Sequence, residues 1–205
     1  MPRKSSIDRV GFFLTAVAVL TACKGGDALP PSDTELAQLD RGVGLMGKFE
    51  FDAAQKLFAR LAERHPRWFE ARFDAGVALL NRQSEGDERA ATETLRALRR
   101  DRPDDINVLY TLGLIALRGE PPKNAEALLR QVRERDPGDA YAAYFLGQAV
   151  LAQGRADEAL QLFERARELD PGLRSASYGA AQALGRLGRE REAQARLEEF
   201  NYLGR

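Results

Sequence analysis

The sequence predicts an all-α fold of about five stacked helix–turn–helix repeats, and three observations support this prediction. Alanine, leucine, arginine and glutamate dominate the 205 residues while β-branched residues are scarce, which favours helix along most of the chain. Prolines recur at a nearly constant spacing. Small and large apolar residues recur in register between them. Self-similarity at a period of this length is typical of repeat architectures, in which each repeat is one supersecondary unit.

The prolines mark where the repeats end. Four of them stand 37, 34 and 34 residues apart, at Pro66, Pro103, Pro137 and Pro171. Proline has no backbone N–H and its ring clashes with the preceding helical turn, so it ends a helix. In the fifth repeat Arg205 occupies this slot. The spacing therefore predicts a series of helical hairpins of similar length.

Small residues mark where the two helices of a repeat cross. A glycine or alanine, a second alanine and a large apolar residue recur in register in every repeat. In chain order they are Gly42, Ala54 and Phe58; Gly76, Ala91 and Leu95; Gly113, Ala125 and Leu129; Gly147, Ala159 and Phe163; Ala181, Ala193 and Leu197. A small residue lets two helix backbones approach closely, and the large residue fills the remaining gap because protein interiors are close-packed.

These markers predict ten antiparallel helices. Their approximate bounds are 34–47, 51–64, 68–82, 88–101, 105–118, 122–135, 139–153, 156–169, 173–187 and 190–203. The second repeat carries three extra residues around 83–88. We expect these residues to lengthen a turn without disturbing either helix.

This register resembles the tetratricopeptide repeat (TPR) family, whose unit is a helix–turn–helix with small residues at the helix crossing. The resemblance covers residues 34–205, in repeats of about 35–68, 69–105, 106–139, 140–173 and 174–205. The aromatic residue that usually ends the first helix is aliphatic in this chain. The resemblance implies a TPR α-solenoid in a right-handed superhelix, with first helices that line a concave groove and bind another protein.

Residues 1–22 have the pattern of a secretory signal peptide. Arg3, Lys4 and Arg9 make its start positive, and an uncharged apolar run follows at 11–22. This run is too short to cross roughly 30 Å of hydrocarbon comfortably as a helix.

The residues that close this segment, Leu20-Thr21-Ala22-Cys23, resemble the lipobox of bacterial lipoproteins. The resemblance implies that Cys23 carries diacylglycerol through a thioether and begins the mature chain. The alternative is a cysteine that happens to end a signal anchor. If Cys23 is lipidated, residues 23–33 comprise this cysteine and a flexible tether, because residues 24–33 are rich in glycine, proline and polar side chains.

An acylated cysteine would hold the chain on a bacterial membrane, since each buried methylene contributes roughly 0.8 kcal/mol. Some bacteria sort lipoproteins by the residue after the cysteine. In those bacteria Lys24, in place of an aspartate, favours the outer membrane over the inner one. We therefore expect a lipid-anchored protein of the bacterial cell envelope that faces the periplasm.

Composition and motifs give no support for catalysis, a metal site or a cofactor. One cysteine excludes an internal disulfide framework, and one histidine, His65, leaves little material for a metal site. The chain has no CxxC, HExxH or GxSxG motif and no phosphate-binding glycine loop. The 31 basic residues balance the 31 acidic ones, which argues against nucleic acid as a ligand. We expect no catalytic residue, metal, cofactor or nucleic-acid partner.

A recurrent aromatic residue on the first helices predicts a binding surface, because aromatic and arginine side chains most often anchor interfaces. With their polar neighbours, these residues form the candidate set for protein binding: Phe73, Asn81, Tyr110, Leu114, Arg118, Tyr141, Tyr144, Gln148, Tyr178, Gln182 and Arg186. The alternative is that the tyrosines pack between adjacent first helices as wedges, and a half-buried tyrosine can do both.

Two further positions carry expectations about packing. Trp68 follows Pro66 at the turn between the first two repeats, where we expect it to fill the core. The last helix carries Leu197, Phe200, Tyr202 and Leu203 with no further helix to cover it. Terminal repeats need a polar outer face, so this end either frays or is covered by another molecule.

The function that this pattern favours is a non-catalytic scaffold that holds another protein or peptide in an envelope assembly. The alternative is an accessory regulator that recruits a periplasmic cell-wall enzyme to the membrane. A third possibility, an enzyme in its own right, has no residue in its favour. The sequence leaves the partner, the envelope pathway and the oligomeric state open.

Overall fold

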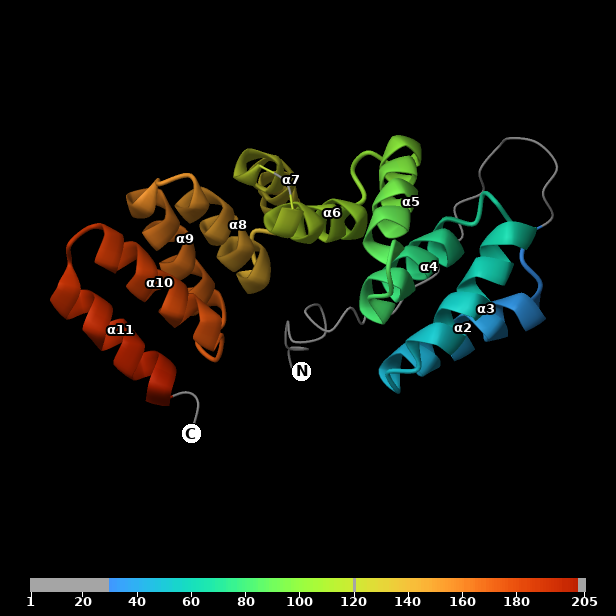
Figure 1. The fold of residues 1–205 in the computed structure, drawn as a ribbon, viewed down its shortest axis with the longest axis horizontal. Helices are drawn as coiled ribbons and strands as arrows, with labels where there is room; N and C mark the ends of the chain where they lie inside the picture. The colour runs from blue at the N-terminus through green and yellow to red at the C-terminus, as the bar shows by residue number, and fades with distance from the viewer. Residues whose placement is uncertain (1–29, 120, 203–205) are drawn as a thin grey trace. The chain divides into compact units, whose positions relative to one another are not determined.

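The computed structural model describes residues 30–119 and 121–202, and these form ten α-helices with no strand (Figure 1). The helices are α2 (Asp33–Gly47), α3 (Phe51–Arg64), α4 (Phe69–Arg82), α5 (Asp87–Asp101), α6 (Ile106–Gly119), α7 (Pro122–Arg135), α8 (Ala140–Ala152), α9 (Ala156–Leu169), α10 (Arg174–Arg186) and α11 (Glu190–Tyr202). Each bound lies within one residue of the predicted one, so the all-α prediction is confirmed. The signal peptide, Cys23 and the tether up to residue 29 lie outside the described residues.

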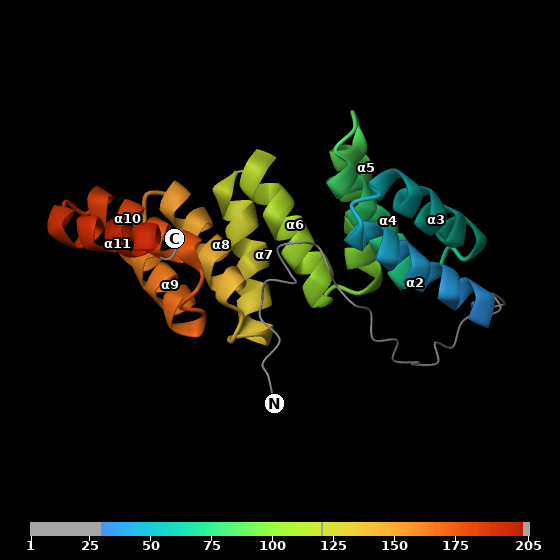
Figure 2. The ribbon, with the colours of Figure 1, turned by 90° about the horizontal axis from the view of Figure 1, so that it is seen from below.

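The chain divides after Pro103 into two compact units, and each is described by itself. Unit 1 holds the hairpins α2–α3 and α4–α5, and unit 2 holds α6–α7, α8–α9 and α10–α11 (Figure 2). Within a unit, every helix packs against the next one in the chain. The handedness of the superhelix stays a prediction. Among the described residues, no helix combines the length and the apolar character needed to cross a bilayer.

The core of unit 1 is built from the large apolar residues of the repeat register. Phe58 of α3 and Leu95 of α5 are almost completely buried. A Cβ atom at Gly42 would lie 2.4 Å from the Phe58 ring, so glycine is required where α2 crosses α3. At Gly76 an added Cβ would lie 3.7 Å from Leu95, an ordinary contact. The first crossing is therefore tighter than the second.

The extra residues of the second repeat form a turn that an ion pair closes. Arg82, the last residue of α4, donates to the carboxylate of Asp87, the first residue of α5, with an Nε–Oδ2 distance of 2.8 Å. The backbone N–H of Ser84 donates to the same oxygen at 2.9 Å. The Arg82 hydrogen bond outweighs burial and holds the pKa of Asp87 below its ordinary value. Both helices keep their length, as predicted.

The start of α2 is tied to the end of α3. Ser32 and Glu35 form a capping box, in which the Glu35 N–H donates to Ser32 Oγ at 3.3 Å. Glu35 also lies 2.9 Å from Nε2 of His65, just after α3. The hydrogen bonds from the Ser32 backbone, from His65 and from the Ser32 hydroxyl lower the pKa of Glu35 to about 2. Trp68 lies edge-on to the His65 ring and is only half-buried. The expectation that Trp68 fills the core is therefore wrong.

In unit 2, one phenylalanine fixes how closely three helices approach. Phe163 of α9 is fully buried. A Cβ at Gly147 of α8 would lie 2.8 Å from its ring, and one at Gly179 of α10 would lie 2.6 Å from it. Two glycines from different repeats therefore press on one ring. Gly113 meets Leu129 in the same way, at 2.9 Å.

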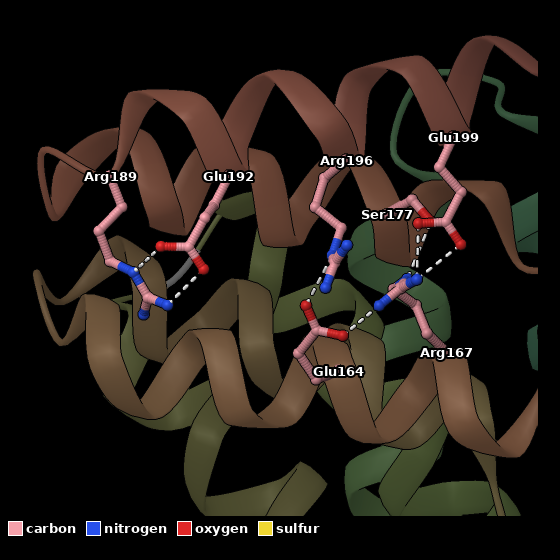
Figure 3. A network of polar contacts seen from close by, with 7 residues as sticks. All are labelled: Glu164, Arg167, Ser177, Arg189, Glu192, Arg196 and Glu199. Carbon is pink, nitrogen blue, oxygen red and sulfur yellow. Dashed lines mark hydrogen bonds and ion pairs between the residues drawn. The ribbon is translucent and has the colours of Figure 1, made fainter.

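The last helix, α11, has no fully buried residue, and ion pairs hold it against α9 (Figure 3). Arg196 of α11 donates to Glu164 of α9 at 2.9 Å, and Arg167 of α9 donates to Glu199 of α11 at 2.6 Å. Arg167 also pairs with Glu164, so the charges of the two helices form one network. Charge pairs thus supplement the limited apolar contact of this helix.

This helix also supplies a polar outer face. Phe200 is half-buried, with its ring 5.5 Å from that of Tyr178 and 4.6 Å from the guanidinium of Arg174. The exposed residues of α11 are Glu190, Arg191, Glu192, Gln194, Ala195, Glu198, Asn201 and Tyr202. Most of them are charged or polar, so α11 presents a polar face to solvent at the end of the repeats. This polar face was not predicted from the sequence.

Candidate functional site

The candidate residues lie on a surface formed by successive first helices. In unit 1, α2 contacts α4, and in unit 2, α8 contacts both α6 and α10. We call these surfaces the first-helix face of each unit. Residues one repeat apart take equivalent positions along such a face, which places the predicted aromatic residues of unit 2 in a row.

The two candidates in unit 1 offer little side chain to a partner. Phe73 of α4 is 6% exposed and belongs to the core. Asn81, near the end of α4, is half-buried and donates its side-chain amide to the carbonyl of Val77 at 2.9 Å. The unit 1 part of the candidate set therefore packs within its own repeats.

The three tyrosines of unit 2 become more exposed from α6 to α10. Tyr110 is 8% exposed, with its ring edge-on to Phe145 of α8 at 6.2 Å. Tyr144 of α8 is half-buried, and Tyr178 of α10 is 44% exposed. The following first helix covers each tyrosine where one exists, and no first helix follows α10 in the described chain. Tyr110 is thus a wedge, whereas Tyr178 is open.

Tyr144 combines packing with hydrogen bonding. Its ring lies 5.0 Å from that of Phe145 and 5.9 Å from that of Phe163. Gln148, one turn later, donates its side-chain amide to the Tyr144 hydroxyl at 2.6 Å. Burial raises the pKa of the Tyr144 phenol, although hydrogen bonds with Ser175 and Gln148 oppose this. The hydroxyl is therefore positioned by both its own helix and α10.

The remaining candidates surround this tyrosine row. Leu114 and Tyr141 are half-buried, and Arg118 and Gln182 are exposed. Tyr141 packs against a small core of alanines and Leu173, and burial, followed by Asp170 and Asp139, raises its pKa. Arg186 is exposed but donates to the carbonyl of Leu151 near the end of α8. The open part of the set is therefore Tyr178, Gln182, Arg118 and the outer edge of Arg186.

Some notable features were not predicted from the sequence. An open pocket of about 190 Å³ lies at the end of α7, lined by Arg130, Arg133, Glu134, Pro137 and Leu146. Arg130 also pairs with Glu126 at 2.8 Å and with Glu158, so its charge is compensated. In the turn between α2 and α3, Phe49 is an apolar residue that is 75% exposed.

Two observations bear on possible chemistry in the described residues. These residues contain no group of three or more histidine, cysteine, aspartate or glutamate side chains that could hold a metal ion. One acid has an unusual environment: burial, followed by the nearby Glu70, raises the pKa of Asp74 to about 7. Its Oδ2 atom is buried with no hydrogen-bond partner in the described part of the chain.

Comparison with known protein families identifies the repeat. A family model described as tetratricopeptide repeat matches residues 39–106 and 110–173, and a second with the same description matches residues 150–200. Together these ranges contain all the crossing residues listed above. No curated protein sequence matches the chain.

Solved structures with a similar fold include several of MamA. MamA from Desulfovibrio magneticus RS-1 superposes with a TM-score of 0.74 at 20% identity, over 84% of this chain and 96% of that one. A MamA structure designated MSR-1 gives 0.70 at 24% identity, over 84% and 98%. One designated AMB-1 gives 0.67 at 24% identity, over 83% and 92%. At these identities the likeness concerns the fold alone.

Proposed function

The chain belongs to the tetratricopeptide repeat family, and on that premise we propose that it is a non-catalytic scaffold that binds a partner protein through the first-helix face of unit 2. The partner is a protein or peptide of the periplasm or envelope. We further propose that a lipid on Cys23 holds the scaffold at the membrane.

The row of tyrosines on unit 2 carries this proposal. Tyr144 and Tyr178 present aromatic rings beside the amide side chains of Gln148 and Gln182. Aromatic rings supply contact area at low cost in conformational entropy, and amides can bond to a peptide backbone. Because Tyr178 is 44% exposed and its neighbour Gln182 is also exposed, a partner could cover both without rearranging the core.

Replacing Tyr178 by alanine should weaken partner binding by about 2 kcal/mol, the scale of an interface hot spot. The stability of unit 2 should change less, because the exposed ring loses little buried area. The partner can be isolated by crosslinking from intact envelopes and then titrated against the purified variants.

Tyr202 provides the matched control, since it is an exposed tyrosine of the same unit that lies on α11 rather than on the first-helix face. Tyr202→Ala should leave affinity unchanged. Tyr144→Ala should mainly lower stability, because its ring packs against Phe145 and Phe163. Equal affinities for the Tyr178 and Tyr202 variants would rule out this face as the binding surface.

The membrane anchor makes a separate prediction. Cys23→Ser should block lipidation and leave the precursor unprocessed, because serine offers no thiol for the thioether. Metabolic labelling with an alkyne fatty acid measures directly whether the protein is acylated. Undiminished label in the serine variant would remove the lipoprotein proposal without affecting the scaffold proposal.

A further inference from the structure

One position in the repeat has a left-handed backbone, and its occupant differs sharply in the first repeat. The residue lies in the turn between the two helices of a repeat. In the four repeats where this turn is described, it is Phe49 (φ 62°), Gln83 (φ 57°), Gly154 (φ 81°) and Gly188 (φ 71°). Glycine adopts this conformation freely, whereas a bulky side chain adopts it at a cost in free energy. The first repeat thus holds a phenylalanine where the last two hold glycine.

Packing within unit 1 does not account for Phe49. Its side chain is 75% exposed, and in the described part of unit 1 its one ring contact is an edge-on approach to Phe51 at 6.0 Å. The residue therefore combines a strained backbone with an apolar surface left in water. A residue that costs stability in two ways is a candidate for a role outside the folded unit.

We propose that Phe49 and Phe51 contact the lipid bilayer and form a second, reversible attachment beside the acylated Cys23. The proposal rests on the lipid anchor of the proposed function. Aromatic side chains are favoured at the membrane–water interface, where apolar residues of a peripheral protein enter the boundary of the acyl chains. We call this pair of residues the aromatic tip.

The length of the tether is consistent with this contact. The nine residues from 24 to 32 span at most about 30 Å when extended. Helix α2, with its 15 residues, adds about 22 Å before the aromatic tip is reached. The tip therefore lies no more than about 50 Å from Cys23. This distance allows it to reach the surface that would hold the lipid, where even weak insertion is favoured by the effective concentration of a tethered group.

The charges around the aromatic tip indicate which lipid it would meet. Lys48 and Lys56 balance Glu50 and Asp52, and all four residues are exposed. This mixture gives no preference for anionic lipid, so insertion would be apolar and would work with zwitterionic headgroups. A protein partner fits less well, because a specific interface buries about 800 Å² per side. This turn presents only the exposed ring of Phe49 and the half-buried ring of Phe51.

Quenching of tryptophan fluorescence by brominated lipid tests the proposal. The full chain, purified from membranes as cells produce it, is placed in vesicles of phosphatidylethanolamine and phosphatidylcholine, the latter with brominated acyl chains. Phe49→Trp should lose most of its additional emission. Glu63→Trp is the matched control, since Glu63 is exposed and lies near the opposite end of α3 from Phe51. Its added emission should persist, as should that of the native Trp68 beyond the same end of α3.

Phe49→Gly separates membrane contact from folding. Glycine relieves the backbone strain, so this variant should melt at no lower temperature than the unsubstituted chain. It should also lose its contact with the vesicle. That loss is measured as faster proteolysis or hydrogen exchange of the 48–51 turn on the membrane. Unquenched emission from Phe49→Trp, or a spectral change that appears only with an envelope protein, would overturn the bilayer proposal.

Mass spectrometry of the N-terminal peptide in the same preparation distinguishes failure of the aromatic tip from failure of the anchor. An acylated Cys23 with unquenched Phe49→Trp emission rejects the tip and keeps the anchor. Quenching without the acyl group supports the tip as a membrane contact and rejects the anchor. If neither signal appears, both proposals are wrong.

Discussion

Phe163→Ala should lower the free energy of unfolding by about 3–5 kcal/mol, the range for a buried aromatic truncated to alanine. The ring is fully buried, and the two glycines that press on it, Gly147 and Gly179, cannot fill the space that it leaves. Three helices would lose their common contact. Urea unfolding followed by circular dichroism measures the loss.

The neighbouring glycines allow a sharper test of the same contact. Gly147→Ala places a Cβ 2.8 Å from the ring and should cost about 1–3 kcal/mol, because Gly179 blocks the ring from shifting away. In Gly185→Ala, the matched control from the same unit, the added Cβ meets nothing within 4 Å, so stability should not change.

The loss of stability caused by Gly147→Ala should be smaller when Phe163 is also replaced by leucine. The fifth repeat has this combination, since Ala181 and Leu197 occupy the equivalent positions. Equal stability of the two alanine variants would mean that the helices do not cross at Gly147.

Asp74→Asn should stabilise unit 1 by about 3 kcal/mol at pH 8 and by about 1 kcal/mol at pH 5. Burial, followed by the charge of Glu70, raises the pKa of Asp74 from 3.8 to about 7. Because the folded-state pKa is the higher one, the stability contributed by the protonated acid is complete below about pH 4. It is lost as the pH rises to about 7. The full difference corresponds to about 4 kcal/mol, and the expected gain is smaller because part of the side chain reaches solvent.

Denaturant unfolding of the two proteins at both pH values checks this prediction. Asp40→Asn, at an exposed position on α2 of the same unit, is the control and should give no gain comparable to that of Asp74→Asn. A gain from Asp74→Asn that does not grow with pH would show that the buried carboxyl is not the source of the instability.

The helices and their crossings could be predicted from the sequence because they are specified repeatedly. A small residue such as Gly147 and a large apolar partner such as Phe163 recur in the same register in each repeat, so one chance residue does not alter the interpretation. The pairing is also local, since both residues belong to one hairpin. Gly179 was missed because it touches Phe163 from the next repeat and lies outside the register.

Exposure of the candidate site could not be predicted in the same way. Tyr110, Tyr144 and Tyr178 are equivalent in the repeat, yet their exposure differs because it depends on which side chains the following helix presents. The ring of Phe145 lies edge-on to Tyr110, which is 8% exposed, whereas Tyr178 lies beside Phe200 of α11 and is 44% exposed. The raised pKa of Asp74 was likewise not predicted, since nothing in a lone aspartate on a helix indicates burial.

Site-specific photocrosslinking in intact cells tests most directly whether the first-helix face of unit 2 binds a protein. A photoreactive residue is placed at Gln182 on α10 and, as the matched control, at Gln161 on α9, another exposed glutamine of the same unit. A partner held on this face predicts a discrete crosslinked species from position 182 that disappears with Tyr178→Ala and is absent from position 161. Equal crosslinking from both positions, or none from 182, would contradict a binding surface on the first helices.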